Sequence, residues 1–352
     1  MDIGREMFIY STLMTLRLSS LSKPAPFSAC IICLLLVKYQ NYFMSALPLV
    51  SVIIPNYNHS AFLRERMESV LNQTYANFEV IIMDDCSADN SRELIEEYRD
   101  HPKVAQIVYN EQNSGSTFKQ WNKGIAIARA ELIWIAESDD VAHPELLETL
   151  VAGLIKNKDV ILSYCQSLRI DAQSKVFSNW LFKTEDLDKD LFLKDFVMDG
   201  HEYIDRFLIY RNTIPNVSAI VFKKESYLQA GGADASIKYV SDWLTWLKML
   251  HNGKLFYSAR MLNSFRYLET GVIHSSEVRK TFFHKYDILM RIIYKGFLEQ
   301  AKPSAEDLYQ KNMFLLRKES RKEFKFLWRK KLFLKSLPYL KLAAFTGRFK
   351  HL

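Results

Sequence analysis

The sequence has few cysteines and none of the glycine-rich signatures of common nucleotide-binding loops. Four cysteines among 352 residues exclude a disulfide-stabilised scaffold. Cys30 and Cys33 have the spacing of a redox or zinc pair, but no second pair accompanies them, so we interpret the spacing as coincidence. Neither G-x-G-x-x-G nor the P-loop pattern occurs, which excludes the two most common phosphate-binding fingerprints.

Long apolar runs are also missing. The best candidate, residues 27–37, is about half as long as the stretch that crosses a bilayer. Residues 1–43 show no strand or helix periodicity, and a signal peptide would need an earlier apolar run and a small-residue cleavage site after Val37. We therefore expect 1–43 to be a leader outside the folded protein, with Met44 as the true start.

The charge is distributed unevenly along the chain. Residues 317–352 contain twelve lysines and arginines and two glutamates, which gives this segment a charge of +10. Because the whole chain has a net charge of +7, the remaining residues carry 7 − 10 = −3 and are mildly acidic. An acidic body is a poor match for nucleic acid, and we expect no nucleic-acid partner. A basic tail suits an anionic membrane surface.

Apolar and aromatic residues recur at helical spacing within this tail, at Phe324, Leu327, Trp328 and Leu332. The pattern predicts an amphipathic helix that Pro338 ends or kinks. Attachment to the inner face of the cytoplasmic membrane would make the protein cytoplasmic and peripheral. A solvated helix packed on the body is the alternative.

Short β-branched runs alternate with helically spaced segments from residue 49 onward. Strands are expected at 49–54, 78–83, 104–109, 132–136 and 160–164, and helices at 61–71, 91–98, 118–129 and 144–155. This alternation predicts an α/β fold with an open, mostly parallel sheet covered by helices on both faces. Beyond residue 165 we expect an irregular excursion at 183–205, a strand at 218–222, a helix at 239–250 and a last strand within 266–276.

Polar residues follow four of the predicted strands, where ligands bind in such sheets. Two of these strand ends carry acid pairs, Asp84 with Asp85 and Asp139 with Asp140. Adjacent carboxylates repel each other unless a cation or hydrogen-bond donors neutralise them, and hard oxygen ligands suit Mg²⁺ or Mn²⁺. A turn and helix cap before Pro144 would explain one pair alone, but two pairs on one rim favour a metal and phosphate site.

Two runs resemble the family 2 glycosyltransferases: residues 50–91, with VSVIIPNYN and VIIMDDCSADNS, and residues 110–147, with NEQNSGSTF and LIWIAESDD. The likeness resumes at Ser218–Leu250, with the Gly-Gly turn and an acid opening a W-L helix. It covers about 200 residues and leaves 170–212 unmatched. The resemblance implies a GT-A glycosyltransferase domain at 44–270, followed by a helical basic extension at 271–352.

The resemblance also implies roles for individual residues. Nucleotide-sugar contacts would come from Pro55, Tyr57, Asn58, Asp84, Asp85, Ser87, Asn113, Gly115, Lys123 and Asp139. Asp140 would bind the metal, and Glu137 would shape the turn. Asp242 would be the catalytic base; a helix N-cap is the alternative, and Ser241 stands where the family usually has a further acid.

One further motif matches the family imperfectly. Leu268 stands where an Arg-x-His pattern starting at Arg266 would place histidine. Arg266, His274 and Ser275 could therefore reach the metal or diphosphate, with an ordinary surface histidine as the alternative.

These features predict an inverting, metal-dependent glycosyltransferase in cell-surface polysaccharide synthesis. It would move a sugar from a nucleotide-sugar donor, by default a UDP-sugar, to a glycan or lipid-linked acceptor. Acceptor recognition is expected in 170–212 and beyond residue 250. A processive synthase would need several membrane spans and a Q-x-x-R-W signature, which the sequence lacks. A non-catalytic GT-A-like module that binds nucleotide or glycan remains the alternative.

Overall fold

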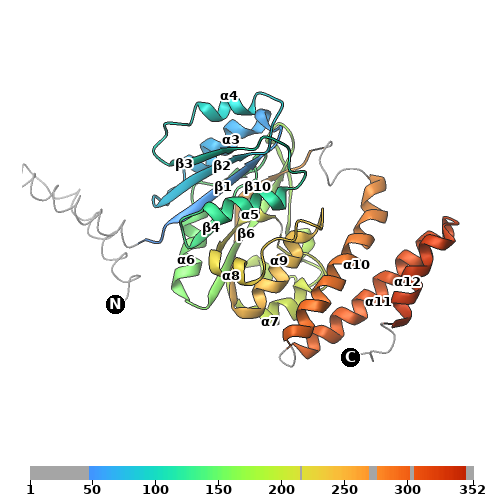
Figure 1. Cartoon of the computed structure of the whole chain (residues 1–352). Helices are drawn as coiled ribbons and strands as arrows, with labels where there is room; N and C mark the ends of the chain where they lie inside the picture. Colours follow the sequence, from blue (N-terminus) through green and yellow to red (C-terminus); the bar gives the residue numbers. More distant parts are fainter. Residues whose placement is uncertain (1–46, 215, 269–275, 302–304, 346–352) are drawn as a thin grey trace, which may run out of the picture. The chain divides into compact units, whose positions relative to one another are not determined.

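The computed structural model describes residues 47–214, 216–268, 276–301 and 305–345 (Figure 1). The leader predicted at 1–43 lies outside the described residues, as do His274 and Ser275. Residues from Leu49 onward form one unit, and the following description concerns that unit.

The first half of this unit is a parallel sheet with helical crossovers. Its strands are β1 (Val50–Asn56), β2 (Phe78–Asp84), β3 (Val104–Tyr109) and β4 (Leu132–Ile135). Its helices are α3 (Ser60–Leu71), α4 (Ser91–Glu96), α5 (Thr117–Ile127) and α6 (Leu146–Lys156). Both β1 and β2 are buried at every position, because helices cover the two faces of the sheet. The predicted elements lie within two residues of these bounds.

The second half makes the sheet mixed. The strand order is β3-β2-β1-β4-β9-β6-β10-β5, with β7 paired to β6 and β8 to β10. These additional strands are β5 (Val141–Ala142), β6 (Val160–Ile170), β7 (Val176–Asn179), β8 (Phe196–Asp199), β9 (Ile220–Lys223) and β10 (Lys254–Arg266). Only β9 separates β4 from β6, and it runs antiparallel to both. The open, mostly parallel sheet is therefore confirmed.

The structure beyond residue 165 adds to the prediction. β10 ends at Arg266, and its apolar pattern is interrupted by the buried Ser258 and Asn263. Most of the range predicted for the last strand, 269–275, lies outside the described residues. The excursion at 183–205 contains β8 and the helix α7 (Gly200–Tyr203), and it buries Tyr203 in the core.

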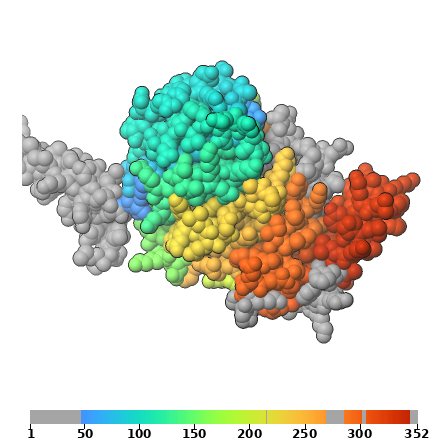
Figure 2. Space-filling view, in the orientation of Figure 1, coloured from blue at the N-terminus to red at the C-terminus, as the bar shows by residue number. Residues whose placement is uncertain are grey.

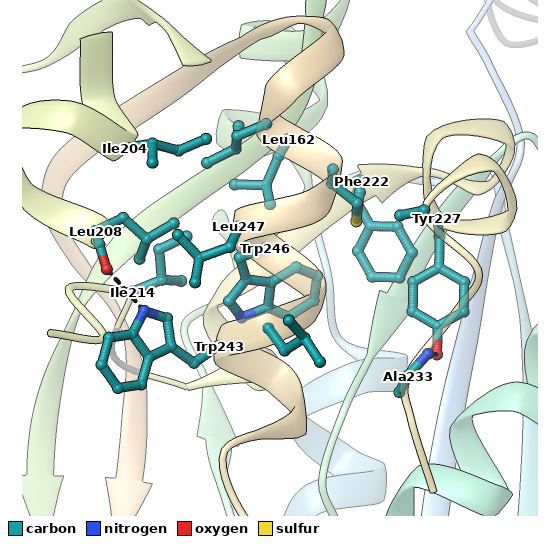
Figure 3. Close-up of a cluster of buried hydrophobic side chains, with 14 of the residues drawn as sticks. Leu162, Ile204, Leu208, Ile214, Phe222, Tyr227, Ala233, Trp243, Trp246 and Leu247 are labelled. Atoms are coloured by element: carbon teal, nitrogen blue, oxygen red, sulfur yellow. Dashed lines mark hydrogen bonds between the residues drawn. The ribbon is translucent and has the colours of Figure 1, made fainter. Parts of the chain in front are cut away.

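Short helices complete the body: 3₁₀ turns at Leu181–Lys183, Leu191–Leu193, Val217–Ala219 and Leu250–Asn252, a π-type turn at Ile204–Leu208, and α8 (Lys224–Gln229). The helix α9 (Ser241–Met249) packs on the sheet through a buried aromatic cluster, with Trp246 beside Phe222 (Figure 3). The Trp243 indole N–H donates to the Leu208 carbonyl at 2.7 Å. This packing fixes the first turn of α9, which contains Asp242.

Three helices follow the sheet: α10 (Ser276–Ala301), α11 (Glu306–Arg329) and α12 (Phe333–Phe345). α10 lies against α9, and α11 against α10 (Figures 1 and 2). The Arg291 side chain reaches the body by donating to the Ile209 carbonyl at 3.1 Å. Pro338 lies inside α12, so the prediction that it ends the helix containing Trp328 is wrong; that helix ends at Arg329. No helix in the described ranges is long and apolar enough to span a membrane.

Candidate active site

A cavity of about 1000 Å³ opens at the carboxyl ends of β1, β2 and β4. Eight of the predicted site residues line it: Pro55, Tyr57, Asp85, Asn113, Gly115, Asp139, Asp242 and Arg266. The predicted residues Asn58, Asp84, Ser87, Lys123 and Asp140 are not part of this lining, and His274 lies outside the described residues. Most of the site residues predicted at the carboxyl ends of the strands therefore surround one cavity, which is where ligands bind in such sheets.

Asp85 is the most heavily hydrogen-bonded acid on the rim. Its Oδ1 accepts from Asn110 Nδ2 at 2.6 Å and Gln120 Nε2 at 2.8 Å. The backbone and hydroxyl of Ser114 donate to Oδ2 at 3.1 and 2.8 Å. Because a carboxylate offers about four lone-pair positions, these four donor groups satisfy it and fix its orientation at the cavity wall.

The neighbouring acid, Asp84, is turned away from the cavity and fully buried. Asn56 Nδ2, the Ser87 N–H and Arg92 Nε each donate to its carboxylate at 3.1 Å. Asn58 joins the same network, because its N–H donates to Ser87 Oγ at 3.0 Å. In this structure these residues shape the loops behind the cavity wall, and their contact with a donor stays a prediction.

Lys123 is exposed outside the cavity, and its Nζ donates to Asn110 Oδ1 at 2.5 Å. Asn110 in turn contacts Asp85, so Lys123 adds positive charge one contact away from the rim. Asn113 and Gly115 form the adjacent turn, in which the Gly115 N–H donates to Asn113 Oδ1 at 2.7 Å and Gly115 has φ +71°. This left-handed backbone favours glycine.

The acidic turn after β4 divides its carboxylates between the cavity and the interior. Glu137 and Asp139 line the cavity, and Asp140 lies directly behind, 2% exposed. Burial, together with the charge of Asp139, raises the pKa of Glu137 to about 8 and that of Asp140 to about 7. Both carboxyl groups therefore keep their protons to a higher pH than exposed acids do.

Two buried arginines hold this turn from behind. Arg66 Nε donates to the Glu137 carbonyl at 2.7 Å, and its Nη2 lies 3.9 Å from Asp140 Oδ2. The Arg266 N–H donates to Asp140 Oδ1 at 2.9 Å, and Arg266 Nε donates to the Asp139 carbonyl at 2.7 Å. Arg266 thus supports the acidic turn, which the sequence did not predict.

Asp242 stands in the first turn of α9 and lines the cavity. Its Oδ2 accepts from Asn212 Nδ2 at 2.9 Å, and burial raises the pKa of its carboxyl group. A carboxylate of raised pKa beside open space is a stronger proton acceptor than an ordinary aspartate. The geometry is thus compatible with a general base.

Several lining residues were missed by the sequence reasoning. His59, Trp180, Lys183, Tyr210 and Arg211 line the cavity, and His59 Nδ1 lies 2.8 Å from Ser138 Oγ. Four of them lie within 170–212, where we expect acceptor recognition, but these loops lack periodicity, so no pattern marked the individual residues. The C-terminal helices contribute too, with Asp287, Glu319 and Lys322.

The turn can be tested for its fit to a divalent cation. Among the described residues, no three His, Cys, Asp or Glu side chains are arranged to hold a metal. Mg²⁺, however, usually binds one or two carboxylates and completes its shell with water and substrate phosphates. Asp139 lines the cavity and Asp140 lies directly behind it, so the turn offers the one or two carboxylates that a cation bound together with a diphosphate needs.

Comparison with known proteins agrees with this architecture. Residues 51–209 match the model of the family described as Glycosyl transferase family 2. An uncharacterized glycosyltransferase of Rickettsia typhi is 29% identical over 259 residues, which is 72% of each chain. The putative teichuronic acid biosynthesis glycosyltransferase TuaG of Bacillus subtilis is 27% identical over 58% of this chain and 73% of its own.

A solved structure shares the fold. TarS of S. aureus, residues 1–349 in complex with UDP-GlcNAc, superposes with a TM-score of 0.55 at 17% identity, covering 77% of this chain and 81% of that one. In the UDP complex of the same protein the TM-score is 0.53, and the chain spans 64% of its length. The fold is therefore the GT-A type. The chain is a glycosyltransferase: its residues 51–209 match the family 2 model, and its relatives include a putative teichuronic acid biosynthesis glycosyltransferase.

Proposed function

We propose that this chain is an inverting, metal-dependent glycosyltransferase that uses a nucleoside-diphosphate sugar, by preference a UDP-sugar, and glycosylates a glycan or lipid-linked acceptor of cell-surface polysaccharide. One observation carries the proposal: the acidic turn and the half-buried Asp242 face the same cavity. The UDP and UDP-GlcNAc complexes of TarS, which has the same fold, support a uridine nucleotide as donor.

On the donor side, Asp85 is the proposed acceptor of a hydrogen bond from the base, which would replace one of the two Ser114 donors on Oδ2. Pro55, Tyr57 and the turn at Asn113 would enclose the base and ribose. Asp139 and Asp140 would hold Mg²⁺ or Mn²⁺ at the diphosphate. When bound, such a cation supplies Lewis-acid stabilisation of the charge on the departing diphosphate.

On the acceptor side, Asp242 is the proposed base. Asn212 holds its carboxylate, which takes the proton from the acceptor hydroxyl. The hydroxyl oxygen bonds to the anomeric carbon on the face opposite the nucleotide. The bond from that carbon to the diphosphate oxygen breaks, the nucleoside diphosphate leaves with the electron pair, and the configuration inverts.

Nucleotide release from a panel of UDP- and GDP-sugars, with and without Mn²⁺, tests the proposal on the full chain. We expect Mn²⁺ to stimulate hydrolysis of the donor. In Asp140→Ala the Mn²⁺-stimulated rate should be about a hundredfold lower than in the wild type, because the charge on the leaving group is no longer stabilised. Asp190→Ala, which changes an exposed acid outside the cavity, is the matched control. Equal rates for wild type and Asp140→Ala would contradict the metal site.

We further propose that α11 and α12 bind an anionic membrane surface. Trp328, Phe333 and Leu334 are 51%, 46% and 84% exposed. Lys330 and Lys331 lie between them in the sequence. Exposed aromatic and aliphatic side chains among lysines suit the interface of an anionic bilayer.

Co-sedimentation with phosphatidylglycerol vesicles tests this surface. Point changes are preferable to truncation, because Glu319 and Lys322 of α11 line the cavity. We expect Leu334→Ser combined with Lys331→Gln to weaken vesicle binding while donor hydrolysis is retained. Lys158→Gln, an exposed lysine of the body, serves as control. Undiminished vesicle binding by the double variant would contradict the proposal.

A further inference from the structure

A second charged region of the cavity lies at the turn that follows β7. Trp180 and Phe182 stack with ring centroids 5.4 Å apart and an interplanar angle of 20°. The Lys183 Nζ lies 5.5 Å from the centroid of Trp180 and 5.6 Å from that of Phe182. Trp180, Lys183 and the 45%-exposed Tyr210 all line the cavity. Aromatic rings beside a cation form a surface on which a sugar ring and an anion can bind together.

Lys183 has no carboxylate within ion-pair distance among the described residues, although its side chain is half-buried. Its charged neighbours are the cations Arg211 and Arg169. Burial, followed by these two guanidinium groups, lowers the pKa of Lys183. Arg211 differs, because the exposed Asp186 accepts two hydrogen bonds from it at 2.9 and 2.8 Å. A bound anion would supply the charge that Lys183 lacks.

The chain connects this region to the candidate base. Arg211 Nη1 donates to the Lys183 carbonyl at 3.4 Å, and the next residue, Asn212, donates to Asp242. The arginines of the acidic turn are different residues, Arg66 and Arg266, and they contact that turn directly. The unpaired cation therefore belongs to the wall that holds the base, where the acceptor hydroxyl must lie.

We propose that Lys183, supported by Arg211 and the Trp180 and Tyr210 rings, binds an anionic group, phosphate or carboxylate, on the sugar acceptor. The inference rests on the proposed function and specifies the acceptor class: a glycan or glycolipid with a negative charge close to the sugar that is glycosylated. A neutral acceptor would leave Lys183 desolvated and without a counter-charge.

Three matched probes test this on the full chain: phenyl β-glucoside, phenyl β-glucuronide and phenyl β-glucoside 6-phosphate. Their dissociation constants are measured by ligand-observed NMR, with and without UDP and Mn²⁺. We expect at least one anionic probe to bind about tenfold more tightly than the neutral glucoside, as one charge-assisted hydrogen bond provides. The two anionic probes distinguish a carboxylate from a phosphate.

Lys183→Gln should reduce this preference to less than twofold while leaving the UDP dissociation constant unchanged. Lys183→Arg should retain most of the preference, and Lys189→Gln, an exposed lysine outside the cavity, should retain all of it. Equal binding of all three probes by the wild type would overturn the inference. So would a loss of UDP affinity in Lys183→Gln, because the cation would then serve the donor.

Failure of the proposed function gives a different result in the same experiment. A chain that binds no UDP and hydrolyses no donor would contradict the donor site. The probe preference measured without UDP would still decide whether Lys183 selects anions.

Discussion

The two walls of the cavity are built on different principles. The donor wall comes from consecutive strand ends, and its Asp85 accepts hydrogen bonds from four donor groups within 35 residues of sequence. The acceptor wall combines the turn at 180–183, the segment at 210–212 and the start of α9. Its Lys183 has no carboxylate partner among the residues that the structure describes. One wall is preorganised by local topology, whereas the other depends on packing between distant segments.

The largest difference between the two walls is expected when the proposed base is removed. Asp242→Asn keeps the size of the side chain but cannot accept a proton, so we expect transfer to fall about 10²- to 10⁴-fold. Donor binding should change little, because Asp85 and Asp139 are untouched. Steady-state kinetics and nucleotide titration measure the two effects separately.

The pH profile adds a second measurement on Asp242. The base must be ionised, and burial raises its pKa above the ordinary aspartate value of about 3.9. Activity should therefore fall with decreasing pH at a higher pH than an exposed aspartate would allow. This acidic limb should be missing from the residual activity of Asp242→Asn. An unchanged limb would assign the titration to another group.

The next largest effect concerns the support of the donor wall. Arg66→Met removes a buried cation from Asp140, and breaking such a pair costs about 3 kcal/mol of unfolding free energy. The adjacent Arg64, whose partner Glu97 is exposed, provides the matched control, and Arg64→Met should change stability little. Urea denaturation measures both.

A double variant checks the cause. In Arg66→Met with Asp140→Asn, the uncompensated carboxylate is gone, so the loss should be smaller than the sum of the two single effects. Additive losses would show that Arg66 stabilises the chain through packing on Trp134 instead. The support of the donor wall by Arg66 would then not depend on the charge of Asp140.

These contrasts explain what the sequence could predict. The donor rim follows from strand ends on a parallel sheet, which a periodic pattern reveals. Side chains alternate along a strand, so adjacent acids face opposite ways: Asp85 meets the cavity and Asp84 the interior. The pattern cannot say which acid faces which side.

One missed residue did leave a trace in the sequence. Arg66 lies on the buried face of α3 with Leu63, Met67 and Val70, at the spacing of an apolar stripe. A charge on such a face needs a buried partner and so points to the acidic turn. No comparable pattern marks Lys183 in the sequence. Its neighbours come from distant segments, and their contacts depend on the whole fold.

The smallest expected effect probes the junction between α9 and the C-terminal helices. His251 Nε2 lies 2.6 Å from Tyr294 Oη of α10, and burial lowers the pKa of His251 to about 3. The folded chain thus favours the neutral imidazole, whose contribution to stability is complete above the unfolded pKa of about 6.5. The contribution is lost as the pH falls from 6.5 towards 3, by about 1.4 kcal/mol per pH unit.

Urea denaturation at pH 7.5, 6.0 and 5.0 measures this loss, with His251→Gln as the comparison because glutamine does not titrate. Carboxylates contribute equally to both proteins, so the difference between their slopes isolates the histidine. We expect the variant to be less stable at pH 7.5 but to lose less stability on acidification. Equal slopes would mean that protonated His251 is accommodated at this junction. The C-terminal helices, which contribute Glu319 and Lys322 to the cavity, would then be held by packing, such as that of Arg291 on Trp243.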